Sequence, residues 1–296
     1  MTGFAAYSGR TMQLDQMSPL EIVTVMNEED ARVPLAIAKC LPQIAQAVTW
    51  AAESFEKGGR LFYMGAGTSG RLGVLDAAEC PPTFGVPKEM VVGLIAGGEK
   101  AFIEAVEGAE DSRELAVEDL KAHGLTANDF VVGIAASVRT PYVLGGLDYA
   151  KSVGCHTAAI ACNIGSAIGK AAELAIEVNC GPEVLTGSTR LKSGTAQKLI
   201  LNMISTGSMV RTGKAYQNLM VDVQQTNEKL HTRAENIVID ATGVEREKAR
   251  AAIDAAGGSV KTAITMLLAD CDAAEAARRL EKARGHVREA IRLEVL

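Results

Sequence analysis

A glycine-rich turn between an apolar segment and a helical one constrains this chain most. Residues 64–71 read Met-Gly-Ala-Gly-Thr-Ser-Gly-Arg, between the apolar run 60–63 and the apolar-periodic stretch 72–78. This order predicts a strand, a tight turn and a helix. The N–H groups of such a turn, with the positive end of the helix dipole, favour an anion. Thr68 and Ser69 add hydroxyl donors, so we expect a small phosphorylated ligand.

The same glycines, Gly65, Gly67 and Gly70, also fit the spacing of a dinucleotide-binding turn. A dinucleotide site needs an acidic residue at the end of the second strand to hold a ribose. The second predicted strand, 90–95, ends in Ala-Gly-Gly, and Glu89 precedes it instead of following it. The sequence therefore favours a sugar phosphate over NAD. A turn without a ligand is the remaining alternative, but a turn requires glycines and not two adjacent hydroxyls.

Alternating apolar and helix-periodic segments predict an α/β fold, a doubly wound parallel sheet. The 296 residues are 48% hydrophobic and 4% aromatic, which suits a core of Ala, Val, Ile and Leu between a sheet and its helices. The predicted strands are 60–64, 90–95, 130–135, 156–162 and 174–179. The predicted helices between and after them are 69–78, 99–122, 141–152, 166–172 and 193–211.

Three regions are expected: an N-terminal helical segment over 1–56, a sugar-phosphate domain over 57–240 and a small helical module over 241–296. In the first region, Ser18-Pro19-Leu20-Glu21 begins a helix that ends near residue 28, and a longer helix is expected over 31–56. The Ala-rich, charged last region predicts helices near 245–256, 259–269 and 273–293. We interpret it as a packing or dimerisation module, with a lid over the site as the alternative.

Charge and cysteine usage exclude several partners. The formal net charge of −6 disfavours nucleic acid and anionic membrane. No stretch reaches the roughly 20 apolar residues of a membrane span, and no signal peptide is visible. The six cysteines lack C-x-x-C spacing and the four histidines are dispersed, so we expect reduced thiols, no metal and a cytoplasmic protein.

Three polar loops follow predicted strands or precede a helix. In open α/β sheets ligands bind beyond the carboxyl ends of the strands, so these loops are the candidate binding site. Each loop alone could be an ordinary helix cap, but three at one sheet edge favour a site. The candidates are Gly67, Thr68 and Ser69 in the first loop, Ser137, Arg139 and Thr140 in the second, and the donor-rich stretch 183–195 as the third.

Two glutamates are candidates for acid–base chemistry. Glu79 is expected at the end of the helix that Pro81-Pro82 stops, where the dipole disfavours a negative charge and favours a proton donor. Glu110 lies in the acidic segment 107–112, a break between helices whose simpler interpretation is a solvated turn.

Four of these segments resemble N-acetylmuramic acid 6-phosphate etherase. They are 64–73, 78–85 (Ala-Glu-Cys-Pro-Pro-Thr-Phe-Gly), 107–112 (Glu-Gly-Ala-Glu-Asp-Ser) and 218–223 (Asn-Leu-Met-Val-Asp-Val). The resemblance runs from about residue 12 to 290. It implies the sugar isomerase (SIS) fold, whose loops bind phosphosugars.

The resemblance also implies a reaction: cleavage of the lactyl ether of N-acetylmuramic acid 6-phosphate by elimination and water addition, without metal or cofactor. By motif, Glu79 is expected to be the proton donor and Glu110 the second carboxylate, acting as the base. The same resemblance implies that Thr68, Ser69, Ser137 and Thr140 hold phosphate or sugar hydroxyls, and that Glu183, Ser188 and Thr189 line the site. The family is homodimeric, and its C-terminal module resembles a ubiquitin-associated fold. Because Val138 replaces the family's usual glycine, the second loop is strained if that position needs a positive φ. The amino-terminal arm 1–10 also departs from the family pattern, which leaves open any role of the arm in the partner's site.

Two other functions remain open at this point. A non-catalytic phosphosugar sensor, as in the related glucokinase regulatory protein, would bind without turnover. An aldose–ketose isomerase of the same fold would release a ketose and no lactate. The presence of both Glu79 and Glu110 counts against the sensor.

Overall fold

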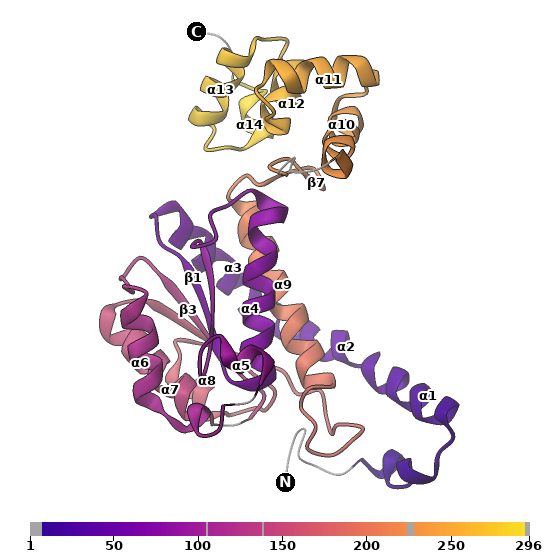
Figure 1. Ribbon diagram of the computed structural model, residues 1–296, viewed down its shortest axis with the longest axis vertical. Helices are drawn as coiled ribbons and strands as arrows, with labels where there is room; N and C mark the ends of the chain where they lie inside the picture. Colours follow the sequence, from indigo (N-terminus) through magenta and orange to yellow (C-terminus); the bar gives the residue numbers. More distant parts are fainter. Residues whose placement is uncertain (1–7, 105, 138, 224–227, 294–296) are drawn as a thin grey trace. The chain divides into compact units, whose positions relative to one another are not determined.

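The computed structural model describes residues 8–104, 106–137, 139–223 and 228–293 (Figure 1). The chain divides into two compact units. Unit 1 is Met1–Ala78 with Lys88–Ser205, and unit 2 is Glu79–Pro87 with Thr206–Leu296. The three-region division expected from the sequence stays a prediction.

Unit 1 contains the expected doubly wound parallel sheet. Among the described residues its strands are all parallel, in the order β2-β1-β3-β4-β5. The sequence located all of them: β2 and β4 are one residue shorter than predicted, and β5 is two residues shorter. Their bounds are β1 Leu61–Gly65, β2 Val91–Ile95, β3 Phe130–Ala135, β4 His156–Ala161 and β5 Leu174–Glu177.

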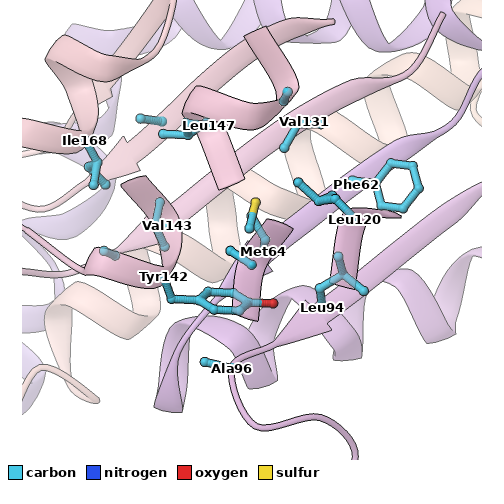
Figure 2. Close-up of a cluster of buried hydrophobic side chains, with 14 of the residues drawn as sticks. Phe62, Met64, Leu94, Ala96, Leu120, Val131, Tyr142, Val143, Leu147 and Ile168 are labelled. Carbon is cyan, nitrogen blue, oxygen red and sulfur yellow. The ribbon is translucent and has the colours of Figure 1, made fainter. Parts of the chain in front are cut away.

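Helices cover both faces of this sheet, because successive side chains of a buried strand alternate between faces. On one face Phe62 and Met64 of β1 pack with Tyr142 and Leu147 in the apolar core (Figure 2). On the other face the Tyr63 hydroxyl donates to the Leu201 carbonyl at 3.4 Å. The first face carries α6 (Arg113–Ala122), α7 (Pro141–Val153) and α8 (Ala167–Ala171); the second carries α3 (Leu41–Glu56) and α9 (Lys192–Arg211) (Figure 1).

The first N-terminal helix begins as predicted and runs two residues further, whereas the second is divided. In α1 (Pro19–Asp30), Ser18 and Glu21 form a reciprocal capping box. The single helix expected over 31–56 is wrong: α2 (Val33–Ile37) and a 3₁₀ turn precede α3. Pro42 lies at the start of α3, where its missing N–H costs least.

The helix after β1 is longer than predicted. The sequence placed its end at Ala78 because of Pro81-Pro82, but α4 spans Gly67–Phe84 with both prolines inside it. Cys80 and Phe84 are buried, so packing outweighs the two lost helical hydrogen bonds. The helix ends at Gly85, which has φ +62° and donates its N–H to the Pro81 carbonyl at 2.9 Å.

The segment expected as a helix over 99–122 is interrupted around the acidic break. It contains α5 (Lys100–Ile103), a 3₁₀ turn η5 (Ala109–Asp111) and α6. Gly108 has φ +75°, and the Ser112 hydroxyl accepts from the Leu115 N–H at 3.1 Å to start α6. Glu110 therefore lies on the short η5 turn.

Unit 2 is built from helices around one apolar core. A two-stranded hairpin, β6 (Ala215–Tyr216) with β7 (Leu219–Met220), contributes Tyr216 to the same core. The helix predicted over 273–293 breaks where Arg284 and Gly285 both have positive φ. The helices are α10 (Glu228–Thr242), α11 (Arg246–Ala255), α12 (Val260–Ala269), α13 (Ala273–Lys282) and α14 (Val287–Ala290). Across the described part of the chain, no helix combines the length and apolarity that a bilayer span requires.

Candidate functional site

The carboxyl ends of β1, β3 and β4 lie side by side in unit 1. Gly65 pairs with Ile134, and Ala135 pairs with Ala161, so the loops that follow these strands start at the same edge. The strand order reverses between β1 and β3, and the crevice at such a switch point is where open α/β sheets bind ligands. The first two loops predicted from the sequence are therefore neighbours there.

Each glycine of the first loop has a steric reason. A Cβ on Gly65 would lie 2.9 Å from both the Gly70 nitrogen and the Ile134 carbonyl oxygen. A Cβ on Gly70 would lie 2.6 Å from the Gly65 oxygen, and Gly67 has φ +52°. The glycine spacing, which resembles a dinucleotide fingerprint, thus allows α4 to begin immediately after β1 and in close contact with it. The first N–H groups of α4 have no partner within the helix, which suits an anion.

The two hydroxyls beside these glycines have different surroundings. Ser69 is buried, and its Oγ donates to Oε1 of Gln197 on α9 at 2.9 Å. Thr68 is half-buried beside the start of α9, where a Cβ on Gly194 would lie 3.6 Å from its methyl group. Gln197 carried no signal in the sequence, because a glutamine inside a helix is most often a surface residue.

The second loop brings together two of its predicted residues. Ser137 Oγ lies 3.1 Å from Thr140 Oγ1, while Arg139 is exposed. Asn163, which follows β4, donates its Nδ2 to the Ala136 carbonyl at 3.3 Å and was not predicted. Val138 lies outside the described residues, so the strain expected there stays a prediction.

The third loop holds the start of α9. Glu183 is fully buried and accepts from the Lys192 N–H at 3.0 Å and from the Ser193 N–H and Oγ at 2.9 and 2.8 Å. Its carboxylate therefore caps the helix, and its expected place in the lining of the site stays a prediction. Ser188 and Thr189 are half-buried, and the Thr189 carbonyl accepts from the Gly194 N–H at 3.0 Å.

A buried ion pair anchors this helix start to α1. Lys192 Nζ lies 2.8 Å from Glu29 Oε2 and donates to the Cys180 carbonyl at 2.9 Å. Burial acts to raise the pKa of Glu29, but the Lys192 hydrogen bond and the positive charges around it outweigh burial and lower the pKa. The pair joins residues 163 positions apart, so sequence spacing gave no sign of it.

The cysteine near the site is structural. Cys162 Sγ donates to the Ser193 carbonyl at 3.7 Å, and burial raises the pKa of this thiol to about 12. All six cysteines are free thiols in the structure. The described residues contain no group of three or more His, Cys, Asp or Glu side chains that could hold a metal ion.

Glu79 and Glu110 are both exposed, and among the described residues neither forms an ion pair. Glu110 belongs to unit 1, on η5. Glu79 belongs to unit 2 and lies on α4, whose end is Phe84. The expected dipole effect at Glu79 is therefore wrong in its premise, because that effect is confined to the last turn. Side chains without a structural partner remain available for chemistry.

The chain is similar to known proteins in both sequence and fold. The family model described as the glucokinase regulatory protein N-terminal SIS domain matches residues 43–151. A curated N-acetylmuramic acid 6-phosphate etherase of Exiguobacterium sp. is 63% identical over 95% of this chain and 96% of its own length. That of Geobacillus sp. is 60% identical over 96% of each chain. The chain belongs to the N-acetylmuramic acid 6-phosphate etherase family.

Solved structures support the fold of this etherase-family chain. Phosphoheptose isomerase from Neisseria gonorrhoeae aligns with 64% of the chain and 98% of its own length, at 18% identity and a TM-score of 0.51. The resemblance stated from the sequence motifs is thus confirmed at the level of the family and of the SIS fold.

Proposed function

We propose that this chain cleaves the D-lactyl ether of N-acetylmuramic acid 6-phosphate to N-acetylglucosamine 6-phosphate and D-lactate, in peptidoglycan amino-sugar catabolism and recycling. The observation that carries the proposal is identity of 60–63% to curated etherases over at least 95% of both lengths. The hydroxyl-bearing loops at the switch point and the two unpaired glutamates support it.

In this proposal the phosphate binds at the start of α4. The N–H groups of Gly67, Thr68 and Ser69 form the first turn of that helix, and the two hydroxyls lie beside them. An anion at a helix N-terminus gains from both the free N–H groups and the dipole. The exposed Arg139 guanidinium is a further donor for the phosphate.

The sugar hydroxyls are assigned to the other two loops. Ser137 and Thr140 present two oxygens 3.1 Å apart at the end of β3. Ser188 and Thr189 are half-buried polar residues before α9, and Glu183 keeps the start of that helix in place.

The chemistry requires one base and one acid. In the open-chain aldehyde, the hydrogen on the carbon next to the carbonyl is acidic. Glu110 takes this proton, and the resulting electron pair forms a carbon–carbon double bond as the neighbouring carbon–oxygen bond breaks. Glu79 protonates the departing lactate oxygen. Water then adds across the double bond, its oxygen to the carbon that lost lactate and its proton to the other carbon.

No electron transfer occurs in this sequence of steps, and carboxylates alone can move the protons, so we propose a reaction without cofactor. We also propose that the enzyme is a homodimer located in the cytoplasm. The buried free thiols support a reducing compartment.

Release of D-lactate from the phosphorylated muramic acid tests the proposal. We expect turnover by the wild-type chain and a loss of about 10²–10⁴-fold in kcat for Glu79→Gln and for Glu110→Gln, the range typical of acid–base groups. Glu107→Gln, an exposed neighbour of Glu110, is the matched control and should keep full turnover.

Three results would contradict the proposal in distinct ways. Wild-type turnover in either variant would remove that glutamate from the mechanism. Formation of a ketose without lactate would identify an isomerase. Binding of the phosphosugar without any turnover would identify a regulator.

A further inference from the structure

The segment that carries Glu79 belongs to the C-terminal unit. Residues 79–87 group with Thr206–Leu296 and not with the parallel sheet. The contact that fixes its end is made by Gly85, where a Cβ would lie 2.4 Å from the Asp222 carbonyl oxygen. With φ +62° as well, this approach of two backbones is open only to glycine.

The helix end before Gly85 depends on this contact more than most helix ends do. Pro81 and Pro82 have no N–H, so two helical hydrogen bonds are missing in the last turns of α4. Fewer internal bonds make the Glu79 turn easier to displace. Its position is therefore set largely by what holds Gly85.

Asp222 is itself held by two cations. Its Oδ2 lies 2.6 Å from Lys261 Nζ on α12 and 3.1 Å from Lys214 Nζ, which precedes β6. The Asp222 and Lys261 side chains are only 19% and 11% exposed, so water screens this pair little. Asp222 thus holds Lys214 and α12 through its carboxylate, and it contacts Gly85 through its backbone carbonyl, all within unit 2.

Lys261 is in turn confined by its own neighbours. A Cβ on Gly285 would lie 3.4 Å from Lys261 Nζ, so the turn between α13 and α14 closes over the ammonium group. Burial lowers the pKa of Lys261, while the charge of Asp222 opposes that shift. Without Asp222 the lysine would be a buried cation with no carboxylate beside it.

We propose that Asp222, clamped by Lys214 and Lys261, is a positioning residue for Glu79. Through it the C-terminal helices hold the end of α4 that carries the proton donor. This inference rests on the proposed function. It gives the helical module a part in the reaction that does not require the module to touch the substrate.

The test is Asp222→Asn in the full-length chain. A small misplacement of a catalytic group can cost about 100-fold in rate, so we expect kcat for lactate release to fall about 10–100-fold with KM within about twofold. Glu275→Gln is the matched control: Glu275 also bridges two cations in unit 2, Arg278 and Arg279, and should leave kcat unchanged.

Hydrogen exchange supplies a readout that needs no turnover. Asp222→Asn should speed exchange of the amides in 79–87 and leave those of β1 unchanged. If the asparagine variant does not fold, Lys261→Gln makes the same test. It removes one of the two cations that hold Asp222, while Lys214 keeps the carboxylate paired.

The outcomes separate the inference from the function. Unchanged kcat and unchanged exchange in 79–87 would overturn the positioning role. Equal losses of kcat in Asp222→Asn and Glu275→Gln would mean that Asp222 contributes only to general stability, which would also overturn the positioning role. If the wild-type chain released no lactate but Asp222→Asn still sped amide exchange in 79–87, only the proposed function would be contradicted.

Discussion

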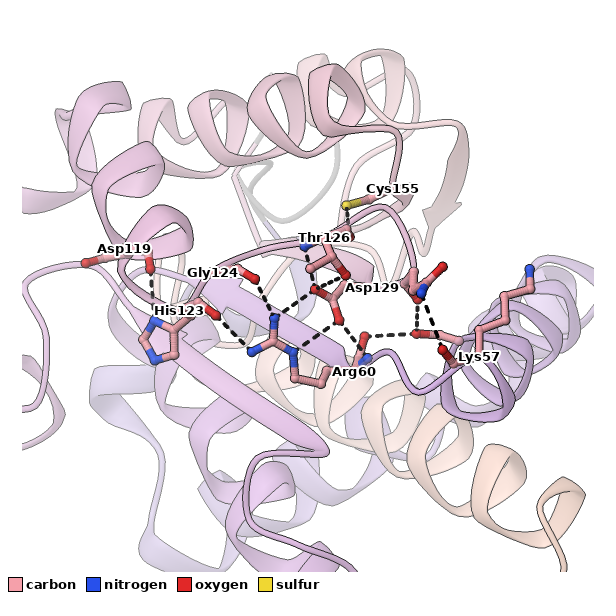
Figure 3. A network of polar contacts seen from close by, with 10 residues as sticks. Lys57, Arg60, Asp119, His123, Gly124, Thr126, Asp129 and Cys155 are labelled. Atoms are coloured by element: carbon pink, nitrogen blue, oxygen red, sulfur yellow. Dashed lines mark hydrogen bonds and ion pairs between the residues drawn. The ribbon is translucent and has the colours of Figure 1, made fainter.

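The two edges of the parallel sheet in unit 1 carry polar networks of opposite kinds. At the amino edge, Asp129 accepts from the Arg60 N–H and guanidinium and from the Thr126 N–H and hydroxyl, at 2.8–3.2 Å (Figure 3). Arg60 also donates to the His123 and Gly124 carbonyls. These donors and acceptors are paired within the fold.

The carboxyl edge has polar groups that remain accessible to a ligand. Gly67 and Arg139 are exposed, and Thr68 and Ser137 are half-buried at the ends of neighbouring strands. A network that is already satisfied stabilises the fold, whereas available donors at a switch point can bind a ligand. Charged residues alone therefore do not identify a binding site. Donors that are not already paired within the fold do.

The largest expected effect breaks the amino-edge network. Asp129→Asn should lower the free energy of unfolding by about 3–5 kcal/mol, since it leaves a partly buried guanidinium without its charge partner. In urea denaturation, Asp148→Asn, which removes the exposed Arg113 ion pair, should cost under about 1 kcal/mol. The kcat of folded Asp129→Asn should equal that of wild type. Equal stability of Asp129→Asn and Asp148→Asn, or a selective loss of kcat in Asp129→Asn, would contradict the difference drawn between the two edges.

A smaller effect is expected where the carboxyl edge is also structural. Glu183→Gln weakens the cap of α9 and should lower stability by about 1–2 kcal/mol. KM should rise as well, because the start of α9 lies against Thr68. Asp272 Oδ1 caps α13 by accepting from the Glu275 N–H, so Asp272→Ala removes that cap and should lower stability without changing KM. A KM for Glu183→Gln equal to wild type would mean that α9 does not shape the site.

The smallest effect compares a thiol at each edge. Burial raises the pKa of both Cys155 and Cys162 to about 12. A folded-state pKa above the unfolded value contributes stability that is complete below about pH 9 and is lost as pH rises toward 12. Cys155→Ala and Cys162→Ala should each flatten the decline in unfolding free energy between pH 9 and 10 by about 1 kcal/mol. A flattening in Cys155→Ala alone would show that the carboxyl-edge thiol ionises in the folded protein.

Much of this architecture was predictable because it depends on local patterns. Short apolar runs located β1 to β5, and the turn residues located the loops after β1 and β3. Gln197, Asn163 and the Glu29–Lys192 pair were not predictable, since each partner lies at least 27 positions away in the chain. Polar residues in helices and strand ends are common, and only folding shows which of them are buried together.

The β1–α4 turn follows from local sequence, because Gly65 and Gly70 approach each other too closely for a Cβ and Gly67 has a positive φ, requirements that arise within six residues. Tertiary structure alone decided that α4 passes through Pro81-Pro82 to Gly85, and that Glu183 caps α9. Both outcomes depend on long-range terms: burial of Cys80 and Phe84, the backbone contact with Asp222, and a carboxylate enclosed by a helix start. Local rules count the cost of a proline or a buried acid, but only the folded chain supplies the contacts that offset it.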